Sequence, residues 1–190
     1  MAMALALGRR GMGRVWPNPA VGCVLVRDGR VVPGSRVDLA RSIIGMVVRA
    51  GAPKPDISTV DAFRKALLDA KSIAYSASAS GVYIENEMYR RLGIHDEAMP
   101  KSRRVYSERV GTVVARGEAE IGFQQVSELL PIQGIEMLGP LPTELQRVTV
   151  FSAGVAAGAR EPDAARELIR FLASPAAEEA VAASGLHQTK

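Results

Sequence analysis

The spacing of hydrophobic positions changes several times along the chain, and each change marks a predicted element. Apolar residues over 2–10 predict a short helix, and two apolar runs flank Arg27-Asp28-Gly29, where Asp-Gly is a strong signal for a tight hairpin. The hairpin is expected over Val21–Val32. The run SIIGMVV predicts a buried strand over Arg41–Arg49.

Beyond residue 52, strand patterns alternate with helix patterns. Ser58-Thr59-Val60-Asp61 has the form of a capping box and opens a predicted helix with one apolar face. Further strands are expected over 72–75, 104–106, 119–123, 135–138 and 148–157. Helical segments are expected over 81–92, 108–116, 126–130, 162–173 and 175–183. This alternation indicates an α/β layered domain with a largely parallel sheet.

Composition limits the class of protein. The chain has 190 residues, of which 47% are hydrophobic and 23% charged, as expected for a folded protein. No apolar run reaches the roughly 20 residues of a membrane-spanning helix. The N-terminal apolar run is followed, not preceded, by arginines, so the sequence as written predicts a cytoplasmic protein. The single cysteine, Cys23, excludes an internal disulfide and is expected to be buried in a strand.

The net charge of +4 raises the question of an anionic partner. The basic residues are scattered, however, and lack the interleaved aromatic residues of a protein that binds single strands, so no nucleic-acid partner is expected. Arg103, Arg104 and Arg109 are expected to be solvated. Tyr83 and Tyr89, at helical spacing, are expected to pack in the core.

The N-terminal segment ALALGRRGMGRVWPNPAVGCVLVRDGRVV, Ala4–Val32, resembles the first helix and hairpin of the pyrimidine deaminase of riboflavin biosynthesis. A zinc deaminase needs a His-x-Glu motif and a Pro-Cys-x-x-Cys motif. The only histidines are His95 and His187, and Cys23 has no second cysteine. One chain therefore cannot assemble this tetrahedral zinc site, and no metal or cofactor is expected.

From about Gly29 the chain resembles a different family, the molybdate-type extracellular solute-binding proteins of ABC transporters. The resemblance rests on GSRVDLARSIIGMVVRAGAPKPDIST, AKSIAYSASASGVYIENEMYRRLGI, VVARGEAEIGFQQVSELLPI and EPDAARELIRFLASPAAEEAVAASGL. It implies a type II periplasmic-binding-protein α/β fold with an incomplete first lobe, and a periplasmic location. The expected domains are a deaminase-like fragment over 1–32 and a solute-binding-protein-like domain over 33–190.

The first group of candidate ligand-binding residues lies in Ser76-Ala77-Ser78-Ala79-Ser80-Gly81, between a predicted strand and a helix. Small residues at a helix start let an anion approach free backbone N–H groups. The resemblance places an oxyanion-donating step at Ser80-Gly81, and Ser78 belongs to the same loop. The alternative is a helix cap with spare serines.

The second group consists of Ser107, Gln124 and Gln125. Ser107 follows a predicted strand, and the resemblance implies a cleft contact there, although plain helix capping is favoured. Gln124 and Gln125 end a strand, where α/β domains bind ligands, but two surface amides would give the same pattern. Molybdate binders of the family have a tyrosine where Gln125 falls, which puts molybdate itself in doubt.

The first interpretation is a non-enzymatic, impaired solute-binding module for a small oxyanion or anionic organic solute. Its expected partners are that solute, an ABC permease and a second copy of the chain, since the helix 162–173 carries an apolar stripe. The alternatives are a nonfunctional or structural chimera, and a fragment of a riboflavin-pathway deaminase. No Ser-His-Asp arrangement, paired carboxylates or phosphate-binding glycine motif argues for catalysis.

Overall fold

The computed structural model describes residues 31–189, which form two compact units. The smaller unit contains residues 31–42 and 149–189, and the larger contains Ile43–Val148. The chain passes between the units twice, after Ser42 and after Val148. Domain boundaries near residue 32 stay a prediction, because the expected helix and hairpin, and Cys23, lie outside the described residues.

The smaller unit is built on an antiparallel sheet in the order β7-β1-β8, where β1 is Val37–Ser42, β7 is Thr149–Ala153 and β8 is His187–Gln188. Its helices are α8, Pro162–Leu172, the 3-10 turn η4, Pro175–Ala177, and α9, Glu178–Ala183. Ile169 of α8 is buried, whereas Leu168 and Phe171 are 42% and 47% exposed.

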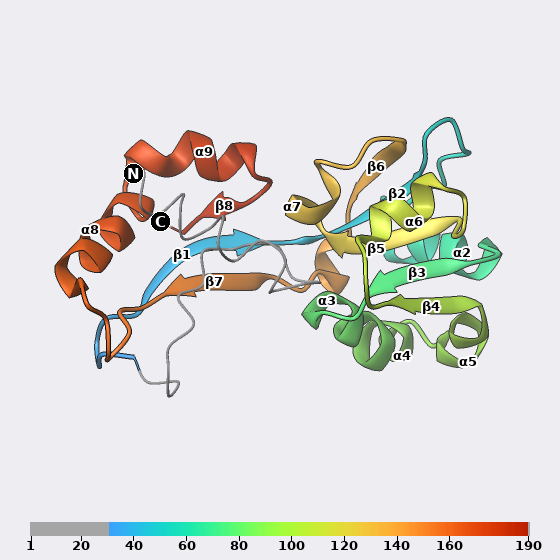
Figure 1. The fold of residues 1–190 in the computed structure, drawn as a ribbon. Helices are drawn as coiled ribbons and strands as arrows, with labels where there is room; N and C mark the ends of the chain where they lie inside the picture. The colour runs from blue at the N-terminus through green and yellow to red at the C-terminus, as the bar shows by residue number, and fades with distance from the viewer. Residues whose placement is uncertain (1–30, 190) are drawn as a thin grey trace. The chain divides into compact units, whose positions relative to one another are not determined.

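The larger unit has a mixed five-stranded sheet in the order β4-β3-β5-β2-β6 (Figure 1). The strands are β2, Ile44–Arg49; β3, Ile73–Ser76; β4, Ser102–Val105; β5, Ile121–Gln125; and β6, Ile135–Pro140. β3 pairs in parallel with β4 and β5, but β2 pairs antiparallel with β5 and β6. The α/β class is confirmed, while the expectation of a largely parallel sheet is wrong for the β2 side.

The helices of the larger unit cover both faces of this sheet. One core contains Phe63 and Leu67 of α2, Val60–Asp69, together with side chains from the segment that follows β3. That segment is α3, Ala79–Tyr83, the π-helical turn η1, Ile84–Met88, and α4, Tyr89–Arg91. Next come α5, His95–Ala98, and the 3-10 turn η2, Met99–Lys101. A further 3-10 turn, η3, Thr143–Leu145, follows β6.

The second core lies under α6, Val110–Ala115, and α7, Val126–Leu129. Gly122 of β5 allows α6 to pack closely, because a Cβ atom there would lie 2.6 Å from Val114 Cγ2 and 2.9 Å from Val110 Cγ1. Figure 1 shows α6 over β5. This contact fixes the start of α6 beside the carboxyl end of β5.

Two local predictions have clear outcomes. The predicted capping box does precede a helix, but the cap is one residue later than its first position, since Thr59 Oγ1 accepts a hydrogen bond from Ala62 N at 3.1 Å. The single strand expected over Arg41–Arg49 is instead two strands, β1 and β2, which belong to different sheets. Ile43 belongs to the same apolar run as Ile44, so the run carries no sign that residue 43 separates the two strands.

Candidate functional site

The carboxyl ends of the three parallel strands bring the predicted site residues to one edge of the larger sheet. β3 ends at Ser76, β4 at Val105 and β5 at Gln125. The register pairs Ser76 with Val105 and Tyr75 with Phe123, so these ends are level. Ser78 and Ser107 lie in the connections that follow β3 and β4, and Ser80 and Gly81 lie in the first turn of α3. We call this region the carboxyl edge.

Three serine hydroxyls meet at the carboxyl edge. Ser76 Oγ lies 2.6 Å from Ser78 Oγ and 3.0 Å from Ser80 Oγ, and the latter two are 3.3 Å apart. Ser76 and Ser80 are buried, and Ser78 is half-buried. Because a hydroxyl both donates and accepts, such a cluster can turn its protons outward toward an anion. We call these three residues the serine cluster.

Ser78 occupies the N-cap position of α3 but makes no side-chain capping bond. Its hydroxyl is directed to the other serines instead, so the alternative of a plain helix cap does not describe this side chain. Gly81 explains the tight loop, because a Cβ atom there would lie 1.7 Å from the backbone oxygen of Ser76. Only glycine fits at this position, and it holds the helix against the end of β3.

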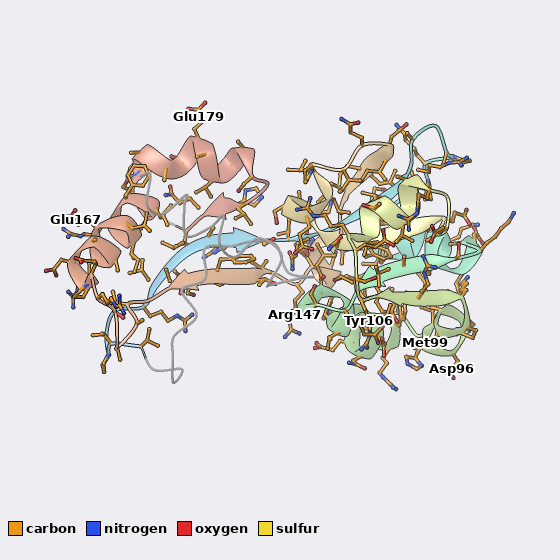
Figure 2. The ribbon with its side chains drawn as sticks, in the orientation of Figure 1. Asp96, Met99, Tyr106, Arg147, Glu167 and Glu179 are labelled. Carbon is orange, nitrogen blue, oxygen red and sulfur yellow. The ribbon has the colours of Figure 1, made fainter. Side chains whose placement is uncertain are left out.

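Ser107 lies in an exposed bend after β4. The favoured alternative, that Ser107 caps a helix beginning at residue 108, is wrong, because α6 begins at Val110 with Arg109 at the N-cap. Tyr106, labelled in Figure 2, precedes it and is 64% exposed. Both side chains are therefore accessible at the end of β4.

Gln124 and Gln125 are 2% and 6% exposed, so the alternative of two surface amides is wrong. Gln124 Oε1 accepts a hydrogen bond of 2.8 Å from the backbone N–H of Val110, the first residue of α6. This bond satisfies one of the amides that a helix start leaves without a partner. Gln125 is the N-cap of α7.

Glu128 of α7 was not singled out from the sequence, yet it is 6% exposed. Among the described residues its Oε2 atom has no hydrogen-bond partner. Burial raises the pKa of Glu128, while a hydrogen bond from Gln124 and the charge of Arg109 oppose the shift. The sequence feature that pointed to a buried acid at this position was a glutamate inside the apolar stretch VSELL, directly after a predicted strand.

The arginines near this edge differ from one another. Arg104 is not simply solvated, since its guanidinium donates to Glu85 Oε2 at 2.5 Å and its side chain is 29% exposed. Tyr75 OH donates to the same carboxylate oxygen at 2.9 Å. Burial alone would raise the pKa of Glu85, but these two hydrogen bonds outweigh it and lower the pKa. Arg103 is exposed and pairs with Glu118 at 3.1 Å.

The tyrosines expected in the core are confirmed there, with Tyr83 at 4% and Tyr89 at 0% exposure. Tyr83 OH donates to Leu145 O at 2.7 Å, and Arg147, labelled in Figure 2, lies 5.3 Å from the centre of the Tyr83 ring. Within residues 31–189 no three His, Cys, Asp or Glu side chains are grouped to hold a metal ion. No helix of that range is long and apolar enough to span a bilayer.

Most of the chain matches a known protein family. Residues 19–187 match the family model described as bacterial extracellular solute-binding protein. This chain belongs to that family. The solved Azotobacter vinelandii periplasmic molybdate-binding protein superposes with a TM-score of 0.63, at 21% identity over 87% of this chain and 73% of that one. This similarity shows a type II periplasmic-binding-protein fold.

Two curated relatives bear on function. A Pseudomonas protein named aconitate isomerase is 48% identical over 162 residues, 85% of this solute-binding-family chain and 62% of its own length. A maize protein named riboflavin biosynthesis protein PYRD, chloroplastic, is 30% identical over 138 residues, 73% of this chain and 28% of its own length. The chain thus spans less than two thirds of either relative.

The first relative corrects the expectation that the chain is not an enzyme. A protein 48% identical over most of the chain is named as an isomerase, which points to catalysis. Triads, paired carboxylates and metal ligands are the patterns that mark catalysis in a sequence, and serine hydroxyls and amides form none of them. The solute-binding part of the resemblance is confirmed, and the fusion to a deaminase-like fragment stays a prediction.

Proposed function

We propose that this chain binds a small polycarboxylate of the aconitate type at the carboxyl edge and takes part in its isomerisation. The serine cluster carries the proposal, because it gathers three hydroxyls where two strands end and a helix begins. The 48% identity to an aconitate isomerase supplies the substrate class. The residues proposed to form the ligand-binding site, by contact or by support, are Ser78, Ser80, Gly81, Ser107, Gln124 and Gln125.

Hydroxyl donors suit a carboxylate ligand. Hydrogen bonds from neutral donors to a charged acceptor are shorter and stronger than those between neutral groups. Ser78 is half-buried and Ser107 exposed, so these two hydroxyls are the ones that a ligand reaches first. Ser80, Gln124 and Gln125 are buried behind them and hold the edge in place.

The chemistry of the substrate favours such a site. The cis and trans forms of aconitate differ in geometry about a carbon–carbon double bond, which cannot rotate while its π bond is intact. Removal of a proton from the methylene carbon spreads the negative charge over three carbons and the neighbouring carboxylate, and this permits rotation. Return of the proton to either terminal carbon completes the isomerisation. Fixed donors on the carboxylate oxygens stabilise the charge that develops.

The family also bears on location and partners. Membership of an extracellular solute-binding family favours a location outside the cytoplasm, against the prediction from the sequence as written. Delivery to an ABC permease, pairing of two copies and weakened binding through an incomplete first lobe stay predictions. So does the alternative of a chimera that binds nothing.

Titration calorimetry tests the proposal with trans-aconitate, cis-aconitate, citrate and molybdate as separate ligands. Binding of the aconitates, with conversion of one form to the other seen by proton NMR, is the expected result. Ser78→Ala should weaken binding about tenfold or more, the value of one charge-assisted hydrogen bond of roughly 1.5–3 kcal/mol. Ser184→Ala, an exposed serine at the end of α9, is the matched control. Binding of molybdate alone would overturn the proposal.

A further inference from the structure

The carboxyl group of Glu128 is a titratable group next to the proposed site and separate from it. The residue is 6% exposed, and its Oε2 atom has no hydrogen-bond partner among residues 31–189. A buried polar atom without a partner is uncommon in folded proteins and calls for a physical explanation. Burial disfavours the ionised carboxylate, so the group holds its proton more tightly than an exposed glutamate does.

The register of the sheet places Glu128 close to the serine cluster. Tyr75 pairs with Phe123, and both belong to the same core. The next residues, Ser76 and Gln124, therefore share the opposite face on neighbouring strands, which lie roughly 4.8 Å apart. Ser76 and Gln124 therefore occupy neighbouring positions, and Gln124 hydrogen-bonds the Glu128 carboxyl. We call the serine cluster, Gln124 and Glu128 the polar row.

Few charges face this carboxyl from the elements that pack against α7. From the start of α6, Arg109 acts on Glu128, while Glu108 is held by Arg116 at 2.7 Å. On the neighbouring strands, Arg49 ends β2 at the far edge of the sheet and Glu136 of β6 is paired with Lys54. Glu120 precedes β5 and accepts from Lys71 N at 2.8 Å. Of these groups, Arg109 is the one whose charge acts on Glu128.

We propose that Glu128 takes up a proton when a polycarboxylate binds at the carboxyl edge, so that anion binding and protonation of this buried group are linked. The inference rests on the proposed function for the identity of the ligand. Negative charge brought beside the polar row repels an ionised Glu128 through a medium of low dielectric, where such repulsion is weakly screened. If the ligand attracts Arg109, less positive charge remains near Glu128 to favour its ionised form.

The sign of the linkage follows from the charges. Binding is tighter when Glu128 is protonated, so affinity falls as pH rises through the pKa of Glu128 in the free protein. The decline stops above the higher pKa of the complex. A single linked proton limits the slope to about tenfold in affinity per pH unit.

Calorimetry of trans-aconitate binding in two buffers of different ionisation enthalpy measures the protons taken up, between pH 5 and 8. Glu128→Gln keeps an oxygen for Gln124 to donate to but cannot titrate. The wild type should take up more protons per bound ligand than Glu128→Gln does. Protons gained or lost by the ligand itself are the same for both proteins, so they cancel in the difference. Glu97→Gln, an exposed glutamate of α5, should match the wild type.

A second measurement, on the wild type alone, tests the inference even if Glu128→Gln does not fold. In wild-type protein labelled with carboxyl ¹³C-glutamate, the titration midpoint of Glu128 should move to higher pH when trans-aconitate is added. Equal proton uptake in wild type and Glu128→Gln, or an unmoved midpoint, would refute the inference and leave the proposed function standing. A wild type that binds neither aconitate would refute the proposed function and this inference with it.

Discussion

The side-chain amide of Gln124 holds the first backbone N–H of α6, with 2.8 Å between Gln124 Oε1 and Val110 N. A residue near the end of β5 thereby fixes the start of α6, the helix that precedes this strand in the chain. The same side chain hydrogen-bonds Glu128, so three elements meet at one amide. Gln124 is 2% exposed, so its side chain is shielded from bulk solvent.

Gln124→Ala should therefore destabilise the larger unit. The change leaves a buried N–H without a partner, which costs about 1–3 kcal/mol, and removes the partner of Glu128 as well. Urea denaturation followed by circular dichroism measures the free energy of unfolding. Gln133→Ala, at an exposed position in the loop before β6, should change it by less than about 0.5 kcal/mol. Equal effects of the two substitutions would show that the amide is dispensable.

Gly81→Ala tests how tightly the loop of the serine cluster is packed. A Cβ atom at this position would lie 1.7 Å from the Ser76 backbone oxygen, which no side-chain rotation can relieve. We expect a loss of about 3 kcal/mol or more in stability, because the backbone itself must move. Gly158→Ala, where a Cβ atom meets nothing within 4 Å, is the control. A thermal unfolding midpoint unchanged by Gly81→Ala would contradict the packing described.

Acid sensitivity should depend on Glu85. Hydrogen bonds from Arg104 and Tyr75 lower its pKa below the usual 4.5 in the folded state. The stabilisation is thus complete above the unfolded-state pKa and is lost as pH falls through the folded-state value. Glu85→Gln should show a smaller loss of stability on acidification than the wild type. Parallel stability curves between pH 7 and 3 would argue against this role.

Glu128 should have the opposite pH dependence. Burial raises its folded-state pKa, so its contribution to stability is complete below the unfolded-state pKa and is lost as pH rises through the folded-state value. Relative to the wild type, Glu128→Gln should gain stability between pH 4 and 8 and level off above the folded-state pKa. Denaturation of both proteins at several pH values checks this. A constant difference across the range would show that Glu128 does not titrate there.

Local signals in the sequence predicted part of this fold. The capping pattern that begins at Ser58 predicted the start of a helix, and the helix is capped one residue later, by Thr59. The loop Ser76–Gly81 was singled out because strand and helix patterns meet there. The pairing partners of β1 and β2 were not predictable, since Ala40 and Ile44 are both buried apolar residues yet pair in different sheets.

The candidate site shows the same division between local and distant information. Positions at the ends of strands can be read from the sequence, but the burial of Gln124 and Glu128 depends on how α6 packs on β5 through Gly122. Catalysis was not predicted, because serine hydroxyls and amides are common surface groups and their pattern along the chain has no catalytic signature. That correction came from the similarity to a named isomerase.

Incubation of the purified chain with pure trans-aconitate, followed by proton NMR, shows whether the chain isomerises aconitate. We expect that cis-aconitate appears, that the same mixture is approached from pure cis-aconitate, and that Ser78→Ala slows both conversions while Ser184→Ala does not. A substrate that stays unchanged, together with no heat of binding for either form, would contradict it.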